Sequence, residues 1–131
     1  MKLVILESPL RGYDYLANLE YARQALHDSL RHGEAPIASH LLYTQVLDDK
    51  KEWQRAIGMA AGHAWYRVAE ACIVYADLGV SEGMRAGIDQ AIDCGIPVEY
   101  RYIHDNQNQN ANSSREDEPP GGRDEGGIET S

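Results

Sequence analysis

The fold is decided by the stretch CIVYADLGVSEGM, residues 72–84. Its first four residues form a short apolar run, typical of a strand that is covered on both faces. The segment then leaves the strand, and Ser81 is well placed to cap a helix that begins directly after it. A buried strand that leads through a short loop into a helix predicts an α/β protein with a mostly parallel sheet.

The same alternation of patterns runs through residues 1–103. Further strands are predicted over residues 3–6, 35–38 and 97–102, and apolar residues at helical spacing predict helices over 16–30, 50–70 and 84–92. The face of the second helix is formed by Trp53, Ile57, Ala60, Ala61, Ala64 and Val68. Residues 40–49 are ambiguous and predict a loop with at most one helical turn. We therefore expect one α/β domain over residues 1–103, with helices on both faces of the sheet.

The composition changes abruptly after Ile103. Residues 104–131 are rich in Asn, Gln, Glu, Asp, Gly and Pro, which predicts a disordered acidic tail. Of the net charge of −9, the residues from Asp105 onward carry −5 and the rest of the chain carries −4. Because neither part clusters Lys and Arg as a phosphate-binding surface requires, we expect no nucleic-acid polymer as a partner.

The cysteines and histidines indicate neither a disulfide framework nor a metal site. Cys72 and Cys94 lie beside apolar residues without a spacing motif, so we expect both to be buried in a reducing compartment. The five histidines show no metal-binding spacing. No stretch is long enough for a membrane span or a signal peptide. We expect a cytoplasmic protein with no membrane partner and no metal.

Ligands of parallel α/β sheets bind beyond the carboxyl ends of the strands. This rule selects the segments 7–14, around His40 and 77–83. The amides that follow Ser81 could bind an anion, although the same residues also suit an ordinary capped helix. In the first segment Arg11 could pair with a phosphate, Gly12 could admit a ligand and Tyr13 could stack on a base, or the segment could simply form a solvent-exposed turn. Asn18 is equally suited to a structural hydrogen bond and to a ligand contact.

Several short motifs, taken in order, carry a resemblance. They are Ser8-Pro9-x-Arg11-Gly12, Asn18, Gly33-x-x-Pro36-Ile37-Ala38-x-His40-Leu41-Leu42, Leu47-Asp48-Asp49, Ser81-Glu82-Gly83-Met84 and Gly95-Ile96-Pro97-Val98. In this order and spacing the chain resembles the nucleoside 2-deoxyribosyltransferase superfamily, in particular small phage and bacterial members of unassigned function.

This resemblance implies a flavodoxin-like three-layer sandwich with a short parallel sheet of four to five strands. It also implies a site for a nucleoside or its 5′-monophosphate, without a cofactor, often completed by a neighbouring subunit of a homodimer or larger homo-oligomer. If the chain is phage-encoded, it would act in the host cytoplasm. The implied ligand-binding residues are Ser8, Arg11, Gly12, Tyr13, Asn18, Ser81, Gly83 and Met84.

The chemistry implied by the resemblance is attack of a glutamate on the anomeric carbon of an N-glycoside. The usual pattern is Ser-x-Gly-Met-x-x-Glu, and the position of that glutamate is Gly87 here. A glycine inside a helix indicates that space is needed there, for a ligand or for close packing. An active enzyme, an N-glycosidase or deoxyribosyltransferase, would then use Asp77 as its key carboxylate, assisted by Glu82 or His40. The alternative is a catalytically inactive nucleotide-binding protein, for example a phage protein that sequesters a nucleotide signal of host defence. A third possibility is an interaction module with a vestigial cleft.

Overall fold

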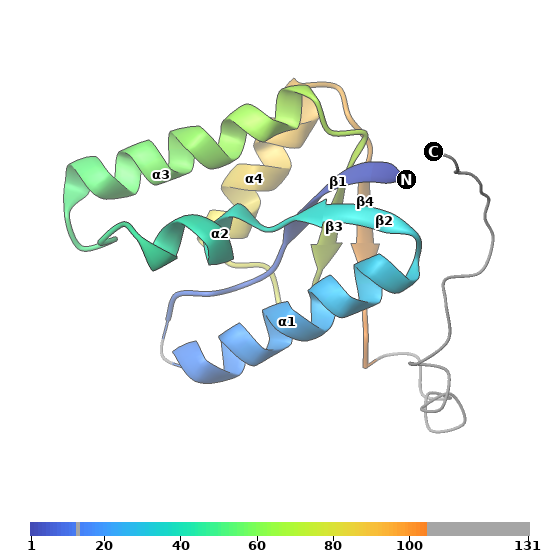
Figure 1. The fold of residues 1–131 in the computed structure, drawn as a ribbon, viewed down its shortest axis with the longest axis horizontal. Coiled ribbons are helices and arrows are strands. Elements are labelled where there is room, and N and C mark those ends of the chain that lie inside the picture. Colours follow the sequence, from blue (N-terminus) through green and yellow to red (C-terminus); the bar gives the residue numbers. More distant parts are fainter. Residues whose placement is uncertain (13, 105–131) are drawn as a thin grey trace.

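The structure, a computed structural model, describes residues 1–12 and 14–104 (Figure 1). Tyr13 and nearly all of the predicted tail lie outside the described residues. The elements are, in chain order, β1 (Lys2–Glu7), α1 (Tyr15–Arg31), β2 (Glu34–Ile37), α2 (Ser39–Leu42), the 3-10 turn η1 (Tyr43–Gln45), α3 (Glu52–Ala64), the 3-10 turn η2 (Trp65–Arg67), β3 (Ala71–Tyr75), α4 (Glu82–Asp93) and β4 (Val98–Arg101).

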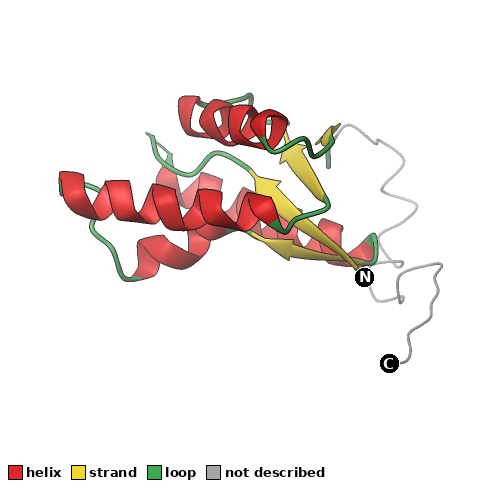
Figure 2. Ribbon diagram, turned by 90° about the horizontal axis from the view of Figure 1, so that it is seen from above, coloured by secondary structure: helices red, strands yellow, loops and turns green. Residues whose placement is uncertain are grey.

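The strands form a four-stranded sheet in the order β2-β1-β3-β4, in which all pairs are parallel. Helices lie on both sides of the sheet (Figure 2). The predicted α/β class is confirmed, and the arrangement is consistent with a flavodoxin-like fold. The chain moves from β1 to β2 on one side and then crosses back to β3 on the other side of β1. The winding direction therefore reverses between β1 and β3.

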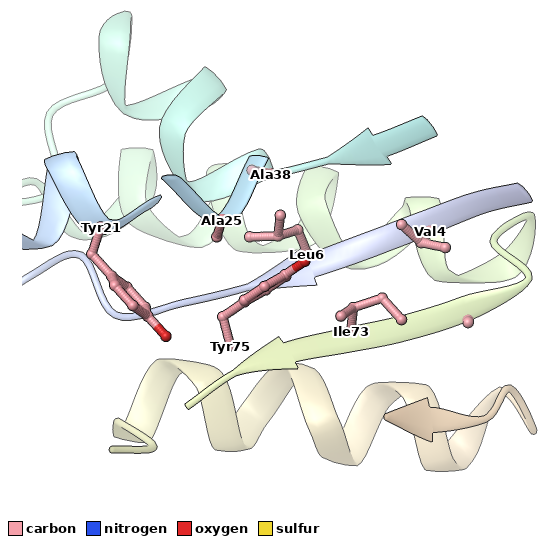
Figure 3. Packing of buried hydrophobic residues seen from close by; sticks show 8 residues of the cluster. Val4, Leu6, Tyr21, Ala25, Ala38, Ile73 and Tyr75 are labelled. Carbon is pink, nitrogen blue, oxygen red and sulfur yellow. The ribbon is translucent and has the colours of Figure 1, made fainter. Parts of the chain in front are cut away.

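One face of the sheet packs against α1. Side chains of a strand point alternately to the two faces, so Val4 and Leu6 of β1 share this face with Ile73 and Tyr75 of β3. Figure 3 shows these residues beneath α1, which contributes Tyr21 and Ala25 to the same cluster. Every residue of β3 is buried, as its continuous apolar run predicts.

The opposite face packs against α4. Cys72 and Val74 of β3 meet Met84, Ile88 and Ala91 of the helix, and η2 adds Tyr66. Cys72 is buried as predicted. The prediction that Cys94 is buried is wrong: Cys94 is exposed, because it is the C-cap residue of α4 and lies beyond the buried face of that helix.

The central helix is shorter than predicted, and its apolar stripe does not pack against the sheet. α3 ends at Ala64, and the following turn carries the chain to β3. Its predicted apolar stripe faces solvent, since Trp53 is 66 % and Ile57 53 % exposed, and Val68 beyond the helix is 59 % exposed. The physical reason is that α3 packs against α2 with its other side, and its N-terminal end lies away from the sheet (Figure 1). The ambiguous segment before it forms α2 and η1, one helical turn and one 3-10 turn.

Among the described helices, none is both long and apolar enough to cross a lipid bilayer.

Candidate functional site

A cavity of about 360 Å³ lies at the carboxyl edge of the sheet. Its walls come from the end of β1, the first turn of α2, one side of α3 and the start of α4. This place is next to the reversal of winding between β1 and β3, where ligands of open parallel sheets bind. The volume falls within the range of small-molecule sites.

The cavity collects most of the residues that the sequence selects. Those that line it are Ser8, Arg11, Gly12, His40, Ser81, Glu82, Gly83 and Met84. Asn18 and Asp77 are not among the lining residues, and Tyr13 lies outside the described residues. The structure thus brings three distant segments of the chain to one place.

Ser8 and His40 form a hydrogen-bonded pair in the cavity wall. Oγ of Ser8 lies 2.8 Å from Nε2 of His40. They meet because β1 and β2 are paired in parallel, with Ile5 opposite Ile37, so that the residues just beyond the two strands are neighbours. Burial lowers the pKa of His40 to about 4, so its imidazole is neutral at pH 7.

Glu7, the last residue of β1, also lines the cavity, and its carboxylate is partly buried. The hydroxyl of Tyr66 donates a hydrogen bond to Oε2 of Glu7. Burial raises the pKa of Glu7 to about 7, and the hydrogen bond from Tyr66 opposes this change. Burial also raises the pKa of Tyr66, so the phenol keeps its proton and remains a donor. Glu7 is therefore a carboxyl group that changes its protonation state near neutral pH.

Gly87 provides the room that Glu7 and Tyr66 occupy. A Cβ atom added at residue 87 would lie 2.6 Å from Cδ of Glu7 and 2.5 Å from Oη of Tyr66. Carbon atoms of real side chains do not approach this closely, so a larger residue would displace the pair. The prediction that a glycine here marks a need for space is confirmed, and the space is taken by a side chain from β1.

The start of α4 forms another wall of the cavity. Oγ of Ser81 accepts a hydrogen bond from the amide of Met84 at 3.3 Å, so the predicted helix cap is confirmed. A Cβ atom added at Gly83 would have no neighbour within 4 Å, which excludes close packing as the reason for this glycine. Glu82 is exposed. The first turn of α4 is thus open towards a ligand.

Two arginines line the cavity. Nε of Arg11 lies 3.8 Å from Oδ2 of Asp49, and both side chains are partly exposed. Arg55 reaches the cavity from α3. Exposed ion pairs of this kind contribute little to stability, so Arg11 can exchange Asp49 for a ligand at small cost.

Asp77 takes part in a different set of contacts. Its carboxylate accepts hydrogen bonds from the hydroxyl of Tyr21 at 2.5 Å and from the amides of Ile103 and His104 at 2.8 and 2.9 Å. Burial alone would raise the pKa of Asp77, but these hydrogen bonds hold it below its usual value. Asp77 joins α1 to the segment after β4, and the structure does not bring it together with His40 or Glu82.

Asn18 also makes a structural contact. Its Nδ2 donates a hydrogen bond to the carbonyl of Leu10 at 3.1 Å, which fixes the loop after β1 against α1. Of the two roles open to Asn18, the geometry favours the structural one.

The sequence assigns no role to Glu7, Tyr66 or His63, although all three line the cavity. The ring of His63 meets that of Tyr66 edge-on, with 5.6 Å between their centres. An acidic residue directly after an apolar strand is the signal that could have identified Glu7. Tyr66 gives no such signal, because its sequence position suits an ordinary helix. In the part of the chain that the structure describes, no group of three or more His, Cys, Asp or Glu side chains could hold a metal ion.

Comparison with known proteins identifies one family. The family model described as "Domain of unknown function (DUF7768)" matches residues 2–101. No curated protein and no solved structure shows a significant match. The match covers all four strands and all the helices of the domain, with the whole cavity. The chain therefore belongs to the DUF7768 family.

Proposed function

We propose that the cavity binds a nucleoside or nucleotide and that the protein acts on the N-glycosidic bond, as an N-glycosidase or deoxyribosyltransferase. The observation that carries this proposal is a titratable carboxyl group, Glu7, inside a cavity lined by most of the residues that the superfamily resemblance implies. Cleavage of a glycosidic bond develops positive charge on the sugar, and enzymes that catalyse it place a carboxylate beside that charge.

The other walls suit the parts of a nucleotide. Apolar and aromatic side chains, among them Leu10, Tyr43 and Met59, offer a surface for a base. Hydroxyl groups of Ser8 and Ser81 can bind sugar oxygens. Arg11 and Arg55 would bind a phosphate locally, although the chain as a whole is acidic and does not attract anions by its net charge.

The test is chromatography of a mixed pool of nucleosides and nucleotides incubated with the full chain. At trace protein, release of free base, or its exchange between sugars, is the expected result. The other outcome is that one compound is depleted only at stoichiometric protein and is recovered intact after denaturation. The protein would then be a nucleotide-binding protein without turnover. The missing carboxylate at Gly87 favours that second candidate. No depletion and no rise in the melting temperature with any compound would overturn the whole proposal.

We further propose that the protein is a homo-oligomer that assembles through the exposed stripe of α3. Trp53 and Ile57 lie on the side of α3 opposite to Gly58 and Gly62, which line the cavity. A row of large exposed apolar side chains on a helix typically marks a contact with another chain, and a self-complementary one gives a two-fold dimer.

The oligomer is tested by light scattering coupled to size-exclusion chromatography. The double variant Trp53→Glu and Ile57→Glu is expected to be monomeric. Leu16→Glu, which changes an even more exposed apolar residue on α1, should keep the mass of the parent protein. A parent protein that is monomeric at high concentration would refute this assembly.

The unpaired thiols of Cys72 and Cys94 are compatible with the cytoplasm, where we propose that the protein acts.

A further inference from the structure

The geometry points to Glu7 as the catalytic carboxylate, which attacks the anomeric carbon of the bound nucleoside or nucleotide from the end of β1. This inference rests on the proposed function and assigns its central chemical step to a residue that the sequence pattern did not single out.

Among the described acidic residues that line the cavity, Glu7 is the one placed for this step. The others are Asp49, which pairs with Arg11, and Glu82, which is exposed at the start of α4. Asp77 is occupied by three hydrogen bonds outside the cavity. Glu7 combines access to the cavity with partial burial, and a carboxylate removed from water is a stronger nucleophile than a hydrated one.

Two neighbours hold the carboxylate of Glu7 in position. Tyr66 donates a hydrogen bond to Oε2, which restricts rotation of the side chain and leaves the second oxygen, Oε1, for the ligand. Gly87 lets the carboxylate lie against α4, in the volume that any side chain at that position would fill. The carboxyl group is thereby fixed on a strand and between two helical elements. Groups fixed on such rigid elements are the ones that meet a substrate at a reproducible distance.

The step is a displacement at carbon. A carboxylate oxygen of Glu7 forms a bond to the anomeric carbon while the bond from that carbon to the base nitrogen breaks. The base leaves with the electron pair and takes up one proton from water. A water molecule then adds to the anomeric carbon, the ester bond to Glu7 breaks, and the water releases one proton to solvent. A second base in place of water would give transfer instead of hydrolysis.

The ionisation of Glu7 gives this role a distinct pH dependence. The titratable or charged groups that face the cavity or Glu7 come from every element around it. They are Arg11, His40, Tyr43, Asp49, Arg55, His63, Tyr66, Cys72 and Glu82. Because Glu7 must be ionised to attack, kcat/KM is expected to fall as the pH decreases through about 7. Tyr66 lowers the pKa of Glu7, so Tyr66→Phe is expected to move this decline to higher pH.

The deciding experiment compares Glu7→Gln, Tyr66→Phe and the control Glu20→Gln in the full chain. Glu20 is an exposed residue of α1, and its change removes the same charge away from the cavity. Using the nucleoside or nucleotide that the pool experiment selects, Glu7→Gln is expected to lower kcat at least about 100-fold. Its dissociation constant for that compound, from calorimetry, should stay within about threefold. Acid quench during turnover should place a sugar adduct on the peptide that contains Glu7.

Each outcome separates the inference from the proposed function. Turnover by the parent protein that persists in Glu7→Gln, with an unchanged pH profile in Tyr66→Phe, overturns the role of Glu7 and leaves the proposed function intact. Binding without turnover by the parent protein also overturns the role of Glu7 and supports the binding protein. Neither binding nor turnover with any compound overturns the proposed function itself. Loss of turnover in Glu7→Gln with intact binding, together with the alkaline shift in Tyr66→Phe, supports the inference.

Discussion

Replacing Glu7 by glutamine is expected to stabilise the protein at neutral and alkaline pH. Glu7 has a pKa of about 7 in the folded chain, against a usual value of 4.5. Between these values the folded state binds more protons than the unfolded state, so the ionisation of Glu7 lowers stability as the pH rises from 4.5 to 7. At about 1.4 kcal/mol per pH unit, the loss above pH 7 is at most roughly 3.5 kcal/mol.

Solvent in the open cavity screens part of this cost, so we expect a gain of about 1.5–3 kcal/mol for Glu7→Gln at pH 8. The glutamine keeps an oxygen that can accept the hydrogen bond from Tyr66, and it fits the space beside Gly87. The gain should nearly vanish at pH 4, where Glu7 is mostly protonated in both states.

The assay is urea unfolding of the parent protein, Glu7→Gln and Glu20→Gln at pH 4, 6 and 8. In thermal unfolding at pH 8, the same gain in the free energy of unfolding corresponds to a rise in Tm of roughly 10 °C for a domain of this size. The reasoning is refuted if Glu7→Gln is less stable than the parent at pH 8. It is also refuted if the two proteins differ by the same free energy of unfolding at all three pH values. The pairing of higher stability with lost turnover is the usual mark of a residue kept for function.

The other predictions concern α4 and the contacts around Asp77. Gly87→Ala places a Cβ against Glu7 and Tyr66, and it should lower the free energy of unfolding by about 1–3 kcal/mol, although alanine favours a helix by about 1 kcal/mol. Gly83→Ala, whose Cβ meets open space, should leave the free energy of unfolding unchanged or raise it. Both values come from urea unfolding. Ser81→Ala removes the cap of α4 and should lower the free energy of unfolding by about 1 kcal/mol, with no loss if the cap is not formed in solution. Asp77→Asn weakens the contacts to Tyr21, Ile103 and His104 and should cost about 2–3 kcal/mol at pH 7. Its turnover per folded molecule should be retained, whereas the sequence-based assignment of Asp77 as the key carboxylate predicts loss of turnover with binding largely intact.

The strands and the edge that carries the cavity could be predicted because they depend on local patterns. The apolar runs around Val4 and Ile73 have no polar interruption, and Ser81 caps its helix through its own side chain. The parallel order then places the loops after β1, β2 and β3 at one edge by topology alone. For this reason Ser8, His40 and Ser81 could be assigned to the site from the amino-acid sequence.

The parts that could not be predicted depend on which side chains meet across the fold. The stripe from Trp53 to Val68 has the spacing of a buried helix face, and spacing does not show whether the covering surface belongs to the same chain. Asp77 occupies a typical active-site position, but three donors from α1 and the segment after β4 form hydrogen bonds to its carboxylate. Glu7 was missed for a different reason. Its place directly after an apolar run is a local signal, but the space for its side chain depends on Gly87, 80 positions along the chain.

The contact between Glu7 and Gly87 also constrains how the sequence can change in evolution. The two positions share one volume, so a change at either is constrained by the residue at the other. A lineage could carry a long side chain on the strand or one on the helix, but each single substitution from one state towards the other passes through a crowded or an empty site. Position 7 and position 87 should therefore covary among relatives, and a search keyed to an acidic residue on the helix would overlook every member in which the carboxylate is carried by the strand.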